Sequence, residues 1–224
     1  MGILEELSDK YPHFDKKIIG YIPLYEMIFS PVRDKTKKVL EIGVQSGNSI
    51  RLWKDFFPNA NIYGWDIDPG SMFKEDRIFT SIVNHDDKVQ VSTALKSIGE
   101  DIDIIIDDGS HRMNSQQSLL AWCLKHVNSG GIYVTEDIGT SFPAKGANYG
   151  LNPSGSNSTY KCFENLIHIG KFYSEYVTSE EKSYIEDNTK VAFMYSTIRK
   201  IPDGFPNLTL ESWPTFPIFV LIKS

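Results

Sequence analysis

Short apolar runs alternate along the chain with segments that have the apolar spacing of an amphipathic helix. The runs end in glycine or in polar residues, and they predict strands at residues 37–44, 61–68, 77–83, 101–108 and 131–137. Helices are predicted between them at residues 48–57, around Val91, Leu95 and Ile98, and at residues 114–126. An alternation of this kind is typical of a parallel sheet covered by helices.

Two of the predicted strands carry further information. Three consecutive isoleucines at residues 104–106 predict a central strand that is buried on both faces. The strand at residues 77–83 has an alternative, in which residues 72–84 form a helix and the strand lies at residues 88–91. We favour the strand at residues 77–83, with the helix after it.

The two ends of the chain complete the predicted fold. Residues 1–34 predict a helical cap, and residues 160–173 predict a further helix. Residues 190–198 and 217–224 predict two closing strands, which we expect to be antiparallel. The predicted fold class is therefore α/β, with a Rossmann-like, doubly wound, mostly parallel sheet, a C-terminal antiparallel strand pair and an N-terminal helical cap.

We expect these parts to form a single domain. The cap is followed by a core at residues 35–141, a loop at residues 142–159 and a closing segment at residues 160–224. The loop contains several Gly and Pro residues and has no apolar periodicity. A long loop in a compact domain is often functional, so we interpret this one as a lid over an active site.

Composition and charge exclude several classes of protein. The chain has 224 residues, of which 41% are hydrophobic and 23% charged, as in ordinary globular proteins. Its net charge of −6 makes nucleic acid an unexpected partner. The start has no signal-peptide pattern, and no apolar stretch reaches the ~18 residues that span a bilayer. Two cysteines, Cys123 and Cys162, are too few for a disulfide framework, so we expect a cytoplasmic location.

The turn after the first strand has features of a nucleotide site. In the run EIGVQSGNS, the small residues Gly43 and Gly47 let the backbone approach a ligand, and the helix that follows offers unpaired N–H groups. The run matches neither GxGxxG nor GxxxxGK[ST], so a pyrophosphate or triphosphate is not expected. Glu41 would repel a phosphate but suit a cation, such as an amino group.

Asp66 ends the second strand, where its carboxylate can accept hydrogen bonds from both hydroxyls of a ribose. Asp66 alone would more often be a solvated strand end. Together with the preceding turn, it suggests an adenosine that carries a charged amino-acid tail.

Three acids follow two neighbouring strands. Asp108 belongs to the run DDGSH, and Glu136 and Asp137 belong to the run TEDIGTS. Three carboxylates at one edge of a sheet repel one another unless a cation joins them, and oxygen ligands favour Mg²⁺, Ca²⁺ or Mn²⁺. The alternative is that Asp107 or Ser110 caps the helix after DDGSH.

His111 lies three residues after Asp108 on the same loop, where an imidazole could act as a general base at neutral pH. The other histidines lack such a setting, and we interpret them as structural or solvated residues: His13, His85, His126 and His168.

These motifs resemble a known family. The runs at residues 41–68, 102–111 and 130–142 resemble class I S-adenosylmethionine-dependent methyltransferases. More narrowly, they resemble the metal-dependent sugar O-methyltransferases of the macrocin and mycinamicin type, and the likeness extends to residues 8–34. A looser similarity, in the spacing of the acids, reaches the catechol-type methyltransferases.

The resemblance implies a role for each candidate residue. The residues that would bind S-adenosylmethionine are Glu41, Gly43, Gly47, Ser49, Asp66, Asn84 and Asp107. Among them, Asp66 would hold the ribose hydroxyls and Asn84 would approach the adenine. The ligands of Mg²⁺, or of another hard divalent cation, would be Asp108, Glu136 and Asp137. His111 would be the catalytic base beside Asp108, and the acceptor would lie against Thr140, Ser141 and Phe142.

We therefore expect a metal-dependent O-methyltransferase that acts on a sugar or glycan with adjacent hydroxyls. Residues 140–146 read TSFPAKG where the family commonly has TSYWP, so one aromatic residue is missing beside the acceptor. The alternatives are a phenol or catechol acceptor, a catalytically silent binding module and, more remotely, a nicotinamide dehydrogenase. The aromatic N-terminal segment is expected either to join subunits of a homo-oligomer or to cap the active site.

Overall fold

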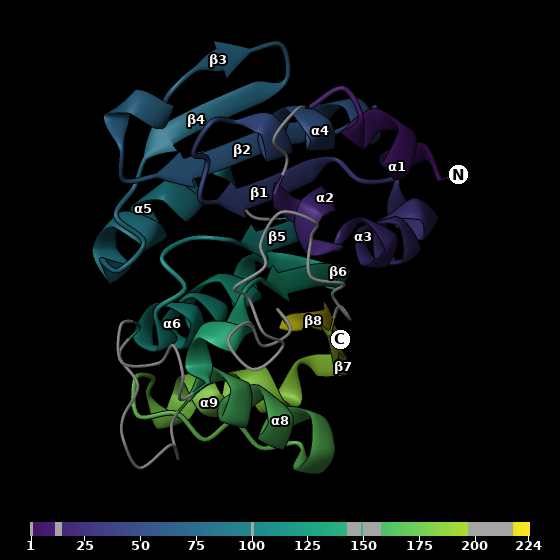
Figure 1. Ribbon diagram of the computed structural model, residues 1–224. Coiled ribbons are helices and arrows are strands. Elements are labelled where there is room, and N and C mark those ends of the chain that lie inside the picture. Colours follow the sequence, from purple (N-terminus) through teal and green to yellow (C-terminus); the bar gives the residue numbers. More distant parts are fainter. Residues whose placement is uncertain (1, 12–14, 100, 143–148, 150–157, 197–216) are drawn as a thin grey trace, which may run out of the picture.

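The computed structural model describes residues 2–11, 15–99, 101–142, 149, 158–196 and 217–224. Within them, one sheet has eight strands in the order β3-β4-β2-β1-β5-β6-β8-β7 (Figure 1). The strands are β1 Lys38–Ile42, β2 Asn61–Asp66, β3 Lys74–Glu75, β4 Ile78–Ile82, β5 Ile102–Asp107, β6 Val127–Thr135, β7 Thr189–Ser196 and β8 Pro217–Lys223. Neighbours from β4 to β6 pair in parallel, whereas β3, β8 and β7 pair with their neighbours in antiparallel fashion.

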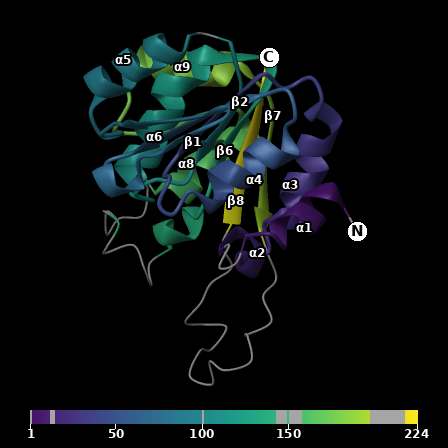
Figure 2. The same ribbon diagram turned by 90° about the horizontal axis from the view of Figure 1, so that it is seen from above.

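Helices cover both faces of the sheet (Figure 2). One face packs against α1 (Ile3–Ser8), α3 (Ile22–Phe29) and α4 (Asn48–Phe56). The other packs against α5 (Lys88–Ile98), α6 (Met113–Cys123), α8 (Thr159–Ile169) and α9 (Ser179–Asp187). Short helices add to these: α2 Asp15–Ile19, η1 Ser30–Val32, η2 Pro69–Ser71, η3 Leu124–His126 and η4 Ile138–Ser141. Within the described residues, no helix is long and apolar enough to span a membrane.

The N-terminal cap packs on the core through aromatic side chains. The ring of Tyr25 lies 5.1 Å from that of Trp53 on α4, and Phe29 lies 5.6 Å from the same indole. The cap is thus an integral layer of the fold.

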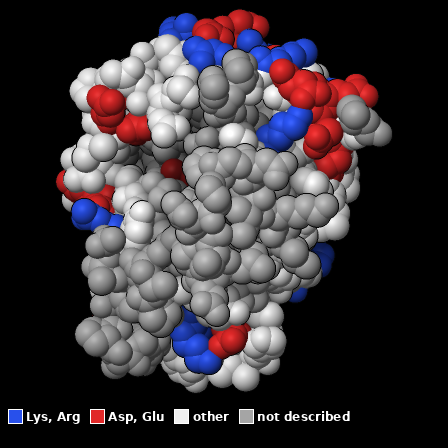
Figure 3. Space-filling model, viewed as in Figure 1, with Lys and Arg blue, Asp and Glu red and all other residues white. Residues whose placement is uncertain are grey.

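Side chains of opposite charge lie next to one another on the surface near α1, α4 and β3 (Figure 3). Arg51 of α4 pairs with Glu75 of β3 at 2.8 Å.

The predicted fold class is confirmed. The run at residues 77–83 forms β4 and is followed by α5, so the alternative helix at residues 72–84 is wrong. The isoleucine run forms β5, which pairs with strands on both sides and contributes side chains to both apolar clusters. The closing strands β7 and β8 are antiparallel, as expected.

Two details differ from the sequence-based expectations. The strand expected at residues 131–137 begins earlier, at Val127, as β6, so it includes the segment NSGG, and Gly130 within it has φ of +76°. The pairing with β5 shifts register there: Ile102 pairs with Val127 and Ile104 with Ile132, so three extra residues lie on β6. The helix α9 was not predicted, although Thr178 and Glu181 form a capping box that marks its start. Most of the predicted lid at residues 142–159 lies outside the described residues.

The topology places a crevice at the carboxyl ends of the central strands. Strand β1 lies between β2 and β5, and α4, which follows β1, packs on the opposite face from α6, which follows β5. Ligands of open α/β sheets bind at such a switch point, beyond the carboxyl ends of the strands. Gly43 has φ of +99°, and a Cβ there would lie 2.1 Å from the carbonyl oxygen of Asp108. The turn after β1 can therefore contact the loop after β5 only because residue 43 is glycine.

Candidate active site

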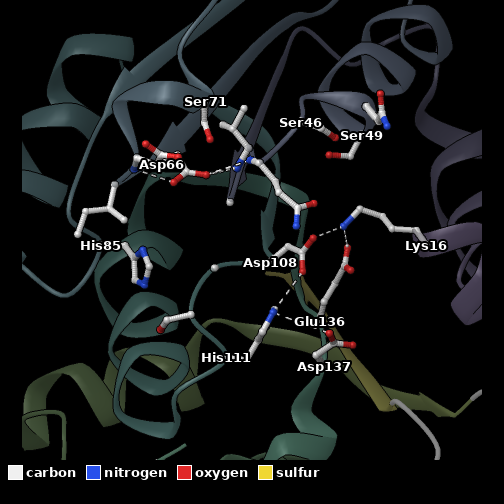
Figure 4. Close-up of a pocket in the computed structure, with 18 of the residues that line it drawn as sticks. Lys16, Ser46, Ser49, Asp66, Ser71, His85, Asp108, His111, Glu136 and Asp137 are labelled. Atoms are coloured by element: carbon white, nitrogen blue, oxygen red, sulfur yellow. Dashed lines mark hydrogen bonds and ion pairs between the residues drawn. The ribbon is translucent and has the colours of Figure 1, made fainter. Parts of the chain in front are cut away.

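A pocket of about 440 Å³ opens at the carboxyl ends of the central strands (Figure 4). Its lining includes most of the residues singled out in the sequence: Gly43, Ser49, Asp66, Asp108, His111, Glu136 and Asp137. It also includes Lys16, from the N-terminal cap, and His85, from the loop after β4. Side chains from four strand ends and from the cap thus meet around one cavity.

Asp66 is held at one end of the pocket by backbone N–H groups. Its Oδ2 accepts hydrogen bonds from Val44 at 2.9 Å and from Gln45 at 3.0 Å, and its Oδ1 accepts one from Asp68. Partial burial acts in the opposite direction, but these donors lower the pKa of Asp66 below its ordinary value. The turn after β1 and the end of β2 are therefore joined through an ionised carboxylate.

Glu41 and Gly47 support the pocket from beneath rather than lining it. Glu41 is fully buried; it accepts hydrogen bonds from Ser49 Oγ at 2.7 Å and from the indole nitrogen of Trp53 at 3.1 Å. Burial raises its pKa. Gly47 has φ of +76° at the start of α4, and a Cβ there would lie 2.5 Å from the ring of Phe73.

The loop after β4 presents His85 to the pocket instead of Asn84. The side chain of Asn84 accepts a hydrogen bond from the backbone of Asp86 and does not line the cavity. His85 does line it, with a side chain that is only 12% exposed. Burial lowers the pKa of His85. His85 was expected to be structural or solvated, and the structure places it in the pocket lining.

Asp107 points away from the pocket into the protein interior. It is only 2% exposed, and burial raises its pKa to about 7. Its Oδ1 accepts a hydrogen bond of 3.4 Å from the backbone of Gly109.

The alternative in which Asp107 or Ser110 caps the next helix is wrong, because α6 has Arg112 at its N-cap and no side-chain cap.

Two of the three acids predicted to bind a metal, Asp108 and Glu136, contact a buried lysine together with Glu41. The ammonium of Lys16 contacts Asp108 Oδ2 at 2.5 Å, Glu136 Oε1 at 2.6 Å and Glu41 Oε1 at 3.3 Å. Burial alone would lower the pKa of Lys16, but these carboxylates outweigh it and hold the pKa well above its ordinary value. The buried acids therefore have an internal counter-ion.

Two tyrosines of the cap complete this arrangement. Tyr21 donates a hydrogen bond of 2.6 Å to Asp137 Oδ1, and Tyr25 donates one to Glu136 Oε1. Lys16, Tyr21 and Tyr25 were not singled out in the sequence, which shows only that the cap is rich in aromatic residues.

His111 faces the acids with a strained backbone. Its Nε2 lies 3.9 Å from Asp108 Oδ1 and 3.8 Å from Asp137 Oδ2. Both His111, with φ of +56°, and Asp137, with φ of +53°, have left-handed conformations that non-glycine residues rarely adopt. The hydroxyl of Thr140 lies 2.9 Å from the carbonyl oxygen of His111 and 3.0 Å from that of Asp137, so it bridges the two loops. Strain of this kind is typical of functional sites.

The donor set fits a hard divalent cation. Oxygen atoms of Glu41, Asp108 and Glu136 lie within 4.8 Å of one another, and ligand atoms of Asp108, His111 and Asp137 form a second such group. Carboxylate oxygens are the preferred ligands of Mg²⁺ and Mn²⁺. The residues present are therefore suited to the metal that the sequence motifs imply.

Comparisons with known proteins agree with this geometry. A family model described as a methyltransferase domain matches residues 40–138, which include β2, β5, β6 and all three acids. Residues 40–138 form a methyltransferase domain. The domain contains Asp66, His85 and His111, whereas Lys16 lies in the cap before it.

Relatives of the methyltransferase domain are named as O-methyltransferases of rhamnosyl tetracenomycin and of mycinamicin. The mycinamicin VI 2''-O-methyltransferase of Micromonospora griseorubida is 37% identical over 148 residues, which are 62% of this chain and 37% of that protein. The 8-demethyl-8-alpha-L-rhamnosyl tetracenomycin-C 2'-O-methyltransferase of Streptomyces olivaceus is 36% identical over 129 residues, 54% of this chain and 34% of that protein. The resemblance to sugar O-methyltransferases is thus confirmed, although the matches span only about a third of these relatives.

The structure also resembles solved methyltransferases. MycE from the mycinamycin pathway, solved in complex with Mg, SAH and mycinamycin VI, is 26% identical with a TM-score of 0.71, over 99% of this chain and 54% of that chain. An O-methyltransferase from Bacillus cereus, 13% identical, has a TM-score of 0.54 over 99% of this chain and 90% of that chain, which reflects the fold alone. The described chain therefore corresponds to about half of MycE.

Proposed function

We propose that this protein transfers a methyl group from S-adenosylmethionine to a hydroxyl group of a sugar or glycan, with a divalent cation, Mg²⁺ above all, bound beside the acceptor. One observation carries the proposal: His111 and the acids Asp108, Glu136 and Asp137 surround the same pocket that Asp66 borders at its other end. The names of the relatives support a sugar as the acceptor.

The cofactor would lie along the turn after β1. The carboxylate of Asp66 is suited to a ribose, because it is acceptor-only and already ionised. The exposed side chain of Ile67 and the partly buried ring of His85 line the same part of the pocket and could enclose the flat adenine. The proposed adenine contact therefore moves from Asn84 to His85.

The metal would be held by Asp108, Glu136 and Asp137. A bound divalent cation can orient two adjacent hydroxyls and lower the pKa of the one that reacts. The acids must be ionised to hold the cation. Glu136 is 2% exposed, and burial raises its pKa well above the ordinary value, so a cation beside it is needed to keep it ionised. Asp137 is less buried and accepts a hydrogen bond from Tyr21.

His111 would accept the proton of the acceptor hydroxyl at Nε2. That nitrogen faces Asp108 Oδ1 at 3.9 Å and Asp137 Oδ2 at 3.8 Å. The acceptor oxygen then attacks the methyl carbon in line with the departing thioether. Positioning of the two reactants contributes most of the acceleration in a displacement of this kind.

The test measures binding and turnover separately. Calorimetry with S-adenosylhomocysteine should show binding without metal, and turnover should require Mg²⁺ and return when Mg²⁺ is restored after chelation. A panel of glycosides with adjacent hydroxyls should be methylated, and the same sugars with one of those hydroxyls removed are the matched controls. Methylation of catechols alone would favour the phenol-type alternative, and absence of S-adenosylhomocysteine binding would contradict the proposal.

A further inference from the structure

The ammonium group of Lys16 lies where a metal cation would be expected. It contacts acids that the proposed function assigns to the metal. Its Nζ lies 2.5 Å from Asp108 and 2.6 Å from Glu136, two of the three proposed ligands (Figure 4). The side chain is only 4% exposed. An ammonium with three donors on three carboxylates satisfies the acids in the way that a metal ion would.

Two of the proposed metal ligands, Glu136 and Asp137, lie in separate groups of potential ligand atoms around Asp108. Glu136 lies with Glu41 and Asp108 around the ammonium, whereas Asp137 lies with Asp108 and His111. A metal bound by Asp108, Glu136 and Asp137 needs oxygens from both groups. Lys16 contacts Oε1 of Glu136 and Oδ2 of Asp108, so it shares both of these ligands with the metal.

Lys16 and a divalent cation would also repel each other. Both would share the carboxylates of Asp108 and Glu136, and like charges at such distances interact strongly in a buried site of low dielectric. The two cations are therefore competitors for the same acids.

We propose that Lys16 is a built-in competitor of the metal. Its ammonium group sets the metal affinity of the site, and it leaves the acids and loosens α2 when the metal binds. This inference rests on the proposed function, because it takes the metal ligands from there. It adds a determinant of metal binding that lies outside the methyltransferase domain at residues 40–138.

The attachment of α2 makes this release feasible. The helix has five residues, and among its residues 16–19 only Lys16 is buried. Ile18 is 61% exposed, and Lys17 pairs with Asp9 and Glu5 on the outside of the cap. Ile19 also packs against the apolar core with a half-buried side chain. Loss of the ion pairs of Lys16 would therefore loosen the first residues of α2, while Ile19 keeps the end of the helix in place.

The first experiment measures Mn²⁺ binding to the full chain without cofactor or acceptor, by calorimetry and by the EPR signal of free Mn²⁺. Lys16→Met keeps the length of the side chain but removes the charge, and we expect it to bind Mn²⁺ at least about tenfold more tightly. Lys17→Met is the matched control, because Lys17 is the neighbouring lysine and contacts none of the site acids. Its affinity should stay within about twofold of wild type. Equal or weaker binding by Lys16→Met would overturn the proposal.

The second experiment uses the wild-type chain and does not depend on the folding of a variant. Hydrogen exchange of the α2 amides should accelerate when Mn²⁺ is added, while exchange in α3 should not. Unchanged exchange in α2 would show that Lys16 keeps its place when the metal binds, which contradicts the proposed release.

Asp137→Asn separates failure of this inference from failure of the proposed function. Asp137 is a proposed metal ligand, and its side chain contacts His111 and Tyr21. It forms no ion pair with Lys16 among the described residues. If wild type binds no Mn²⁺, or if Asp137→Asn binds it equally well, the metal assignment itself is wrong. If Asp137→Asn loses binding while Lys16→Met equals wild type, only the role of Lys16 is wrong.

Discussion

The hydroxyl of Tyr21 donates a hydrogen bond of 2.6 Å to Oδ1 of Asp137, although 116 residues separate the two. The bond holds one carboxylate oxygen and leaves Oδ2 directed at His111, 3.8 Å away. Tyr21 is fully buried at the start of α3, so its own position is well defined. The cap thus orients a proposed metal ligand.

Tyr21→Phe should therefore weaken metal binding. The variant keeps the buried ring and loses only the donor, and groups that orient metal ligands typically contribute 10- to 100-fold in affinity. We expect the Kd for Mn²⁺ to rise by about tenfold, as measured by calorimetry. Tyr11→Phe is the matched control, because Tyr11 donates a similar bond of 2.9 Å to Asp55, on α4 and outside the pocket lining. Equal effects of both variants would indicate that the loss is general destabilisation.

His111→Asn should remove the proposed base without adding backbone strain. Asparagine tolerates the left-handed conformation that residue 111 adopts, whereas alanine does not. Turnover should fall on the order of 10²-fold or more, because general bases typically contribute 10² to 10⁴. Binding of S-adenosylhomocysteine should stay within about twofold. His168→Asn, at an exposed position of α8, is the control; unchanged turnover of His111→Asn would remove His111 from the mechanism.

Thr140 should act through its hydroxyl. Thr140→Val keeps the shape of the side chain but removes the bridge to the loops of His111 and Asp137, so turnover should fall by about tenfold or more as the two groups lose their alignment. Thr140→Ser keeps the hydroxyl and should retain most of the activity. Cofactor binding, measured by calorimetry, should be similar in both variants. If Ser and Val substitutions lowered turnover equally, packing rather than the hydrogen bond would be responsible.

His85 should make the protein less stable in acid. Burial lowers its pKa in the folded state, opposed by Asp86 and Asp66, so below about pH 6.5 the unfolded chain binds more protons at this residue. The free energy of unfolding therefore falls as the pH falls, by up to about 1.4 kcal/mol per pH unit. His85→Gln should lose this contribution, so its urea midpoint should change less than that of wild type between pH 7.5 and pH 5.5. His168→Gln should behave like wild type.

Local patterns in the sequence were sufficient for most of the fold. The apolar runs of β1, β4 and β5 and the helix face of α5 reflect nearest-neighbour requirements of strands and helices, so they can be predicted without knowledge of the packing. The site acids could be predicted for a related reason. Parallel strands have their carboxyl ends at one edge, so Asp108, Glu136 and Asp137 had to lie near one another.

Details that depend on the direction of single side chains could not be predicted in this way. The pocket contains His85 and not Asn84, and Asp107 points inward while Asp108 points outward. Successive residues at a strand end point to opposite faces, so a shift of one residue exchanges the functional group. The register shift in β6 has a similar cause, because only the pairing with β5 defines where the extra residues lie.

By itself, the sequence determined the order of strands and helices, the acids at the strand ends and the histidine beside them, because each depends on residues close together in the chain. Only the tertiary structure decided that Lys16, Tyr21 and Tyr25 hold those acids. These contacts join residues about 90 to 120 positions apart. They exist because the cap packs over the carboxyl ends of β5 and β6, and no local pattern in the chain encodes that packing.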